Sequence, residues 1–232
     1  MRISLFAGST RELAPQLLSA IDKQPASQPL WCGLFGLQGD EQAERRHHGG
    51  PERALHHYPA DHYPFWRSWQ RSLGLADPVT PWQPAAFGEN LSTLGMSEGQ
   101  VHIGDVFRLG EALVQVSQPR SPCFKLNACF GYPGFAVLLQ ASGRCGWLLR
   151  VLEEGWVAPD AELTLIDRAH NLSVRRCADI LFNQERVEAD LRLLAELPVL
   201  SPNWRQHARD WLERGEPGDW RRRLLGPEGI PA

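Results

Sequence analysis

Glycine and proline recur so often in the first two thirds of this chain that short strands joined by turns are the expected structure. The 232 residues include 21 glycines and 18 prolines, most of them before residue 160. Both residue types interrupt regular structure and favour turns. Short apolar and alternating runs lie between these breaks and are typical of β-strands. We therefore expect a mixed β+α fold that begins with a barrel or sandwich.

The clearest strand pattern surrounds Gly110-Glu111. Residues 101–106 and 112–116 carry apolar side chains in the spacing of strands, which predicts a β-hairpin that leads directly into residues 118–126. Further apolar runs at 146–152 and 163–166 extend the β character to about residue 167.

After about residue 171 the apolar spacing changes to that of amphipathic helices. Ser173 is a candidate cap for a first helix, residues 187–197 predict a second, and Ser201-Pro202 offers a cap and a first-turn proline for a third. We assign residues 1–167 to a β domain and 171–232 to a C-terminal three-helix domain. The run Arg221-Arg222-Arg223 is expected to be a solvated face.

Composition restricts the partners. A hydrophobic content of 43%, a net charge of −3 and a pI near 6.2 are typical of a globular protein without a basic field, so nucleic acid is not an expected partner. The first ten residues hold too few apolar side chains for a signal peptide or a membrane span. We expect a cytoplasmic protein with no membrane partner.

Cysteine usage limits the redox chemistry. The five cysteines are odd in number and contain no C-x-x-C pair, which argues against a disulfide framework, a zinc ribbon or an iron–sulfur cluster. No G-x-G-x-x-G dinucleotide fingerprint is present either. Electrons for any redox reaction must therefore come from another protein. The cysteines are Cys32, Cys123, Cys129, Cys145 and Cys177.

One cysteine stands out by its neighbours. Cys123 lies between Arg120 and Lys125 on a segment stiffened by Pro119 and Pro122. Nearby cations favour a thiolate, the form that attacks electrophiles or binds a metal. We interpret Cys123 as a functional thiol held accessible on this loop. The alternative is that Cys123 is a small buried apolar residue.

Two polar segments accompany this cysteine. In the first, Gly49-Gly50 lets a ligand approach the backbone and Arg53 supplies a forked donor suited to phosphate. In the second, Glu89-Asn90 carries acceptors and amide donors that can read the edge of a heterocycle. Five of the eight histidines lie between residues 47 and 62, but no H-E-x-x-H spacing is present. A histidine metal site is therefore not favoured over hydrogen-bonding or cofactor-contacting roles.

Taken in order, these segments resemble the MOSC domain, and within that superfamily the stand-alone bacterial YiiM type, in which a barrel precedes a small three-helix domain. The resemblance covers nearly the whole chain. It rests on Gly39-Asp40, residues 47–55, Gly88-Glu89-Asn90-Leu91, Ile103-Gly104-Asp105 and residues 118–126.

The resemblance implies a MOSC β-barrel with flanking helices. It also implies a molybdenum cofactor, a pterin dithiolene with a phosphate tail whose metal is held by a cysteine. By its place in the motif that ligand is Cys123, which is also the expected catalytic residue. The cations Arg53, Arg120 and Lys125 are expected to contact the phosphate or the pterin. The glycine-rich backbone and Glu89-Asn90 are expected to hold the heterocycle. The implied cofactor contacts are His48, Gly49, Gly50, Arg53, Glu89, Asn90, Arg120 and Lys125.

The resemblance further implies reduction of N-hydroxylated compounds, such as hydroxylaminopurine base analogues, to amines. Because the chain has no cluster or flavin motif of its own, the expected partner is a separate flavin-containing reductase. The sequence does not fix the oligomeric state, and both a monomer and an oligomer stay open. The alternative function is a sulfur carrier or cofactor-binding module in which Cys123 holds a persulfide. A cysteine hydrolase is less favoured because no histidine adjoins Cys123 in the sequence.

Overall fold

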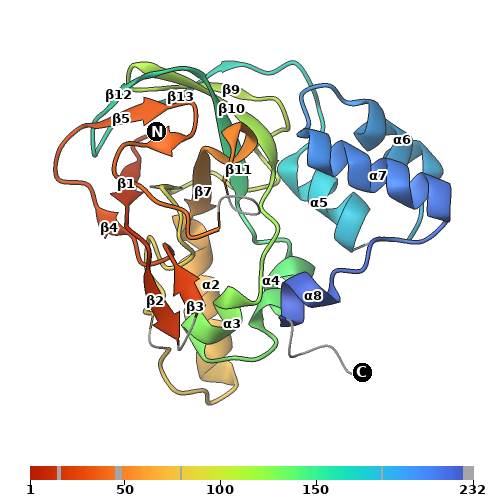
Figure 1. Ribbon diagram of the computed structural model, residues 1–232, viewed down its shortest axis with the longest axis horizontal. Helices are drawn as coiled ribbons and strands as arrows, with labels where there is room; N and C mark the ends of the chain where they lie inside the picture. Colours follow the sequence, from red (N-terminus) through yellow and green to blue (C-terminus); the bar gives the residue numbers. More distant parts are fainter. Residues whose placement is uncertain (15–16, 45–48, 79, 184, 227–232) are drawn as a thin grey trace.

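The computed structural model describes residues 1–14, 17–44, 49–78, 80–183 and 185–226. Its centre is an eight-stranded sheet that curls into a half-barrel (Figure 1). All neighbouring strands run antiparallel except β7 and β8, which are parallel. In sheet order the strands are β13 (Leu163–Asp167), β9 (Val106–Leu109), β10 (Ala112–Pro119), β11 (Trp147–Glu153), β7 (Leu55–Pro59), β8 (Leu91–Thr93), β1 (Ser4–Ala7) and β4 (Gln24–Pro25).

Backbone hydrogen bonds connect the start of the chain to the far edge of this sheet. The amide of Ile3 donates to Ala161 at 3.0 Å, and the terminal ammonium of Met1 donates to Leu163 at 2.9 Å. The expected barrel is therefore present as a curled sheet whose ends approach each other. Two smaller antiparallel sheets flank it: β12 (Gly155–Val157) with β5 (Leu30–Gly33) and β6 (Gly36–Leu37), and β2 (Arg11–Ala14) with β3 (Leu17–Ser19).

The predicted hairpin at Gly110-Glu111 is confirmed by the pairing of β9 with β10. Its first strand is shorter than expected, because residues 101–105 form a turn. Within this turn the carboxylate of Asp105 accepts from the amide of His102 at 2.9 Å and pairs with Arg168 at 2.7 Å. The backbone of residues 101–103 pairs with residues 172–174: the amide of Ile103 donates to Leu172 at 2.9 Å.

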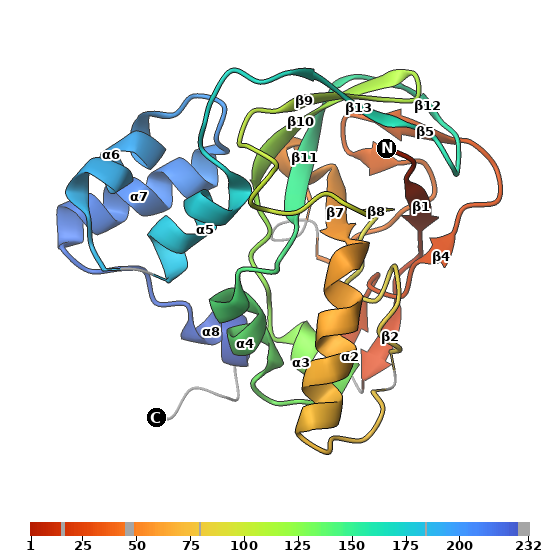
Figure 2. The ribbon, with the colours of Figure 1, turned by 180° about the vertical axis from the view of Figure 1, so that it is seen from behind.

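Three helices lie below the sheet (Figure 2). They agree with the flanking helices that the resemblance implied, although no sequence pattern had given their residue ranges. They enclose an aromatic cluster that includes Trp66, Trp82, Phe87, Phe130 and Phe135. Stacking of Trp82 on Phe130, with ring centroids 4.1 Å apart, shows how closely the cluster packs. The helices are α2 (Tyr63–Ser72), preceded by the 3₁₀ turn η2 (Ala60–His62), α3 (Lys125–Phe130) and α4 (Phe135–Ser142).

The three predicted C-terminal helices are confirmed as α5 (Val174–Phe182), α6 (Glu188–Glu196) and α7 (Pro202–Arg214). Ser173 caps α5 as expected, because its hydroxyl accepts from the amide of Arg176 at 3.1 Å. Ser201 is the N-cap residue of α7 and Pro202 begins the helix, as expected, although the buried hydroxyl of Ser201 has no hydrogen-bond partner among the described residues. A further short helix, α8 (Arg221–Leu225), follows.

The hydrophobic core runs without a break from the sheet into the C-terminal helices. One cluster of buried side chains contains Leu109 and Val116 of the sheet together with Leu181, Leu191 and Trp204 of the helices. The helices therefore use the sheet as the second layer of their core. The division into residues 1–167 and 171–232 stays a prediction. No helix in the described residues is long and apolar enough to cross a membrane.

Candidate functional site

Cys123 lies on the loop between β10 and α3 and is the partly exposed member of the five cysteines, all of which are described. The other four are buried. Burial raises the pKa of Cys32, Cys129 and Cys145 to about 12, and it raises that of Cys177 as well. Burial therefore disfavours the thiolate at these four cysteines, and Cys123 is the thiol that a ligand can reach.

Backbone contacts hold the cysteine loop at both ends. The amide of Arg120 donates to Gly146 at 3.1 Å, and the amide of Leu126 donates to Cys123 itself at 3.1 Å as α3 begins. Between them, the amide of Phe124 donates to the carbonyl of Arg223 at 2.8 Å. Residues more than 90 positions away along the chain thus contact this loop.

Arg223 corrects the expectation that the three terminal arginines form one solvated face. Arg221 and Arg222 are exposed, whereas Arg223 is partly buried and donates to Pro122 and, at 2.6 Å, to Gln140. Burial lowers its pKa to about 10. Sequence reasoning missed this residue, although the apolar pair that follows it indicates a helix with one packed face.

Three buried polar atoms near this loop have no hydrogen-bond partner in the described part of the chain: Arg120 Nη1, His56 Nε2 and Gln118 Oε1. The exposed fraction of His56 is 8% and that of Gln118 is 1%. Burial, followed by the charge of Arg120, lowers the pKa of His56, so its imidazole is neutral. Unpartnered buried polar atoms require an explanation, and a bound polar ligand supplies one. His56 was not singled out from the other histidines.

The remaining predicted cations lie in different directions. Arg53 ends the 3₁₀ turn η1 (Pro51–Arg53), and burial lowers its pKa. It lies near His207 of α7, whose pKa is lowered by burial and also by Arg53. Lys125 instead donates to the carbonyl of Leu18 in β3 at 2.8 Å. Lys125 thus extends toward β3 and Arg53 toward α7, and the expected convergence of all three cations stays a prediction.

The predicted glycine-rich segment is only partly described. His48 lies outside the described residues, and Gly49 and Gly50 are partly buried. Gly50 has φ of +98°, which favours glycine, and an added Cβ would have no heavy atom within 4 Å. Open space beside Gly50 is consistent with close approach of a ligand to this backbone.

Glu89 and Asn90 have internal partners, and their expected contact with a cofactor stays a prediction. Glu89 is fully buried and accepts from the amides of Ala85 at 2.7 Å and Phe87 at 3.1 Å, and from the hydroxyl of Tyr63. Burial nevertheless raises its pKa to about 7. These bonds use both carboxyl oxygens, which gives Glu89 a structural role in shaping the turn.

The contacts of Asn90 connect two of the sequence motifs. Its side chain accepts from the amide of His56 at 3.1 Å and donates to Asp40 at 2.9 Å. Asp40 in turn pairs with Lys23, whose burial lowers its pKa. The Gly39-Asp40 and Gly88-Glu89-Asn90 motifs are therefore parts of one buried polar network that holds β7, the strand of His56.

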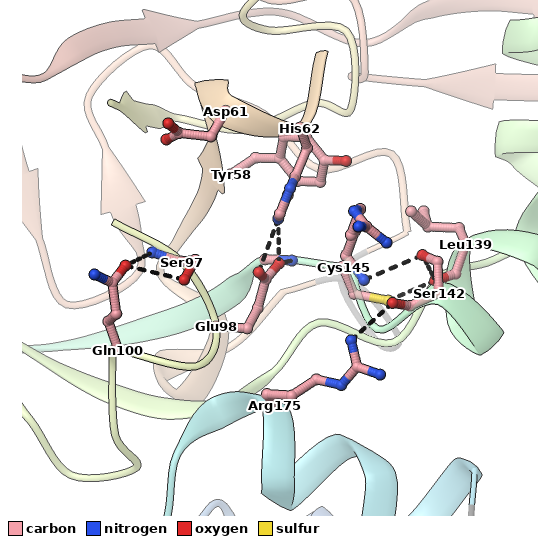
Figure 3. Close-up of polar contacts among 12 residues, drawn as sticks. Tyr58, Asp61, His62, Ser97, Glu98, Gln100, Leu139, Ser142, Cys145 and Arg175 are labelled. Atoms are coloured by element: carbon pink, nitrogen blue, oxygen red, sulfur yellow. Dashed lines mark hydrogen bonds and ion pairs between the residues drawn. The ribbon is translucent and has the colours of Figure 1, made fainter. Parts of the chain in front are cut away.

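A buried pair of His62 and Glu98 (Figure 3) supports the backbone beside the start of the cysteine loop. His62 Nε2 lies 2.8 Å from a carboxyl oxygen of Glu98, and the other Glu98 oxygen accepts from the amide of Gly146 at 2.8 Å. Gly146 is the residue whose carbonyl accepts from Arg120. Glu98 thus fixes the backbone on which the cysteine loop begins.

Residues 44–164 match the MOSC domain model and residues 172–215 match the YiiM-like 3-alpha helix domain model. The chain therefore belongs to the MOSC domain family.

Among its relatives, Protein YiiM of Escherichia coli (strain K12) is 40% identical over 225 residues, which cover 97% of this chain and 98% of the relative. The crystal structure of YiiM from Escherichia coli superposes with a TM-score of 0.78 at 36% identity and covers 97% of this chain and all of that one. A protein named Reductase from Gibberella moniliformis is 41% identical over 161 residues, which cover 68% of this chain and 27% of that protein. This chain is therefore a YiiM-like member of the family.

Proposed function

We propose that this protein is a molybdenum-cofactor-dependent reductase that converts N-hydroxylated compounds to amines, with Cys123 as the metal ligand. The observation that carries the proposal is one accessible thiol next to buried polar atoms that lack partners among the described residues. Membership of the MOSC family and the relative named Reductase support the coarser statement that the protein is a reductase.

The donor set suits this cofactor. A thiolate is a soft ligand that matches a thiophilic metal. Arg120 Nη1 can donate to an anionic or carbonyl group, Gln118 Oε1 can accept from a heterocycle N–H, and neutral His56 offers a second contact. Arg53 and the open backbone at Gly50 are the proposed contacts for the phosphate. His48, Gly49 and Lys125 stay untested proposals.

The bound cofactor supplies two-electron transfer to the N–O bond of the substrate. In the overall reaction the N–O bond of R–NHOH breaks, two electrons and two protons are consumed, and R–NH₂ and water are released. The chain's residues hold the cofactor and orient the substrate. We propose that the electrons come from a separate flavin-containing reductase, because the chain carries no flavin or cluster motif.

The decisive experiment compares Cys123→Ser with wild-type protein made in a host that supplies the cofactor. We expect wild-type protein to contain molybdenum in stoichiometric amount, and Cys123→Ser to retain little because a hydroxyl is a harder, poorer ligand. Cys32→Ala is the control, since Cys32 is buried in β5. Equal molybdenum in Cys123→Ser and wild type would refute the ligand assignment.

Substrate reduction then tests the activity. With a flavin-containing reductase and a nicotinamide we expect loss of an aryl or purine hydroxylamine and formation of the amine; without the reductase we expect neither. Turnover should fall as salt is raised, because charged docking surfaces are screened. Molybdenum-loaded protein that reduces no hydroxylamine with any reductase would favour the cofactor-binding or sulfur-carrier function.

A further inference from the structure

The short C-terminal helix α8 packs against the region that carries Cys123. In both views it lies beside α4 and near α3, away from the α5–α7 bundle (Figures 1 and 2). It also lies outside residues 172–215, the part matched by the three-helix family model. The backbone of α8 thus lies apart from the bundle, although the guanidinium of Arg223 also reaches the ring of Phe182 at the end of α5.

The contacts of α8 lie on both sides of Cys123. The guanidinium of Arg223 donates through Nη1 to the carbonyl of Pro122, and the backbone carbonyl of Arg223 accepts from the amide of Phe124 at 2.8 Å. One residue of α8 therefore binds the residue before the cysteine and the residue after it. A second bond, from Asn127 to the carbonyl of Leu224 at 3.0 Å, fixes α8 to the first turns of α3.

The other arm of the guanidinium is also held. Arg223 Nη2 donates to Gln140 Oε1 of α4 at 2.6 Å, so the planar fork connects two separate segments. The same group lies 5.2 Å from the ring centroids of both Phe182 and Trp220. An arginine with both arms bonded and two aromatic neighbours is fixed in one geometry.

We propose that Arg223 is a positioning residue for Cys123, which holds the cysteine loop in the geometry needed to ligate the metal. The inference rests on the proposed function in taking Cys123 as the ligand. A ligand is effective only when its supporting residues hold it in place, and here that support comes from α8.

The first test needs no cofactor. Hydrogen–deuterium exchange of the full chain should show that the amide of Phe124 exchanges about tenfold to a hundredfold faster in Arg223→Gln than in the wild type, because charge-assisted bonds that hold α8 are lost. Arg222→Gln is the matched control, since Arg222 is exposed on the same helix. Unchanged exchange at Phe124 in Arg223→Gln would overturn the inference.

The second test measures molybdenum retained after gel filtration of protein made in a cofactor-competent host. We expect the molybdenum content of Arg223→Gln to be lower than that of the wild type by about tenfold or more. Arg223→Lys should recover part of this content, because lysine keeps the charge without the forked guanidinium. Arg176→Gln controls for stability: it removes an ion pair with Asp190 inside the helical bundle. An equal loss in Arg176→Gln and Arg223→Gln would mean a merely structural role and overturn the inference.

Gln140→Leu provides a second route if Arg223→Gln does not fold, because it removes one acceptor and leaves the arginine in place. It should accelerate exchange at Phe124 in the same direction, and unchanged exchange would overturn the inference. The two proposals fail differently. Suppose that wild-type protein contains no molybdenum, while Arg223→Gln still exchanges faster than the wild type at Phe124. That result would refute the cofactor function and leave the support of the loop by α8 intact.

Discussion

Gly146 is the position at which a single added methyl group should be most informative. Its φ is +72°, a left-handed conformation, and an added Cβ would overlap the backbone carbonyl oxygen of His57. Gly131 is the matched control: its φ is +64°, yet an added Cβ would have no heavy atom within 4 Å. Alanine at either position meets the same backbone penalty, and only Gly146→Ala adds a clash.

The magnitudes follow from these two terms. The left-handed conformation disfavours alanine by about 1–2 kcal/mol. Alanine also restricts the unfolded chain, which offsets part of this cost, so we expect Gly131→Ala to lower the free energy of unfolding by about 1 kcal/mol. Overpacking at Gly146 adds about 1–3 kcal/mol, and displacement weakens the bond from its amide to the Glu98 carboxylate. Gly146→Ala should therefore lose about 3–5 kcal/mol, a large part of the stability of a typical domain.

Urea unfolding followed by tryptophan fluorescence measures both variants, because the chain has nine tryptophans. Molybdenum retention should also fall in Gly146→Ala, since the carbonyl of Gly146 accepts from the amide of Arg120 at the start of the cysteine loop. Equal losses of stability in the two variants would refute the argument, because they would mean that the contact with His57 adds nothing to the shared conformational cost.

Three further predictions concern titratable groups. At pH 8, iodoacetamide should modify Cys123 well before the buried cysteines, as peptide mass mapping would show, and equal labelling of Cys129 would contradict this. The pKa of Glu89 is raised from 4.5 to about 7, so its stabilising contribution is fully present below about pH 4.5 and is lost as pH rises through about 7. Urea midpoints between pH 5 and 8 should therefore decline less in Glu89→Gln than in wild type; parallel curves would count against the shift. Finally, Glu98→Gln should lower stability by about 1–3 kcal/mol because buried bonds to His62 and Gly146 weaken, whereas Glu188→Gln in an exposed helix pair should leave the urea midpoint unchanged.

Local patterns predicted the elements that depend on local forces. The alternation around Gly110 and the amphipathic spacing of residues 173–212 correspond to the observed hairpin and to α5, α6 and α7. The resemblance implied flanking helices, but no residue ranges were assigned to α2, α3 and α4. Helix α2 does carry an amphipathic pattern, with Tyr63, Trp66 and Gln70 on its buried face. The aromatic partners that these helices pack against come from separate parts of the chain and are set by the fold.

The features of the candidate site likewise fall into those set by the local sequence and those set by tertiary contacts. The sequence by itself determined that Cys123 lies on a stiff, cation-flanked loop, because charge and proline geometry act between near neighbours. Only the tertiary structure decided which polar groups are left for a ligand. It gives Glu89 and Asn90 internal hydrogen bonds, leaves atoms of His56 and Arg120 without partners in the described residues, and brings Arg223 to the cysteine from about 100 residues away. Whether a polar side chain is satisfied depends on contacts distant in sequence, and such contacts exist only once the chain has folded.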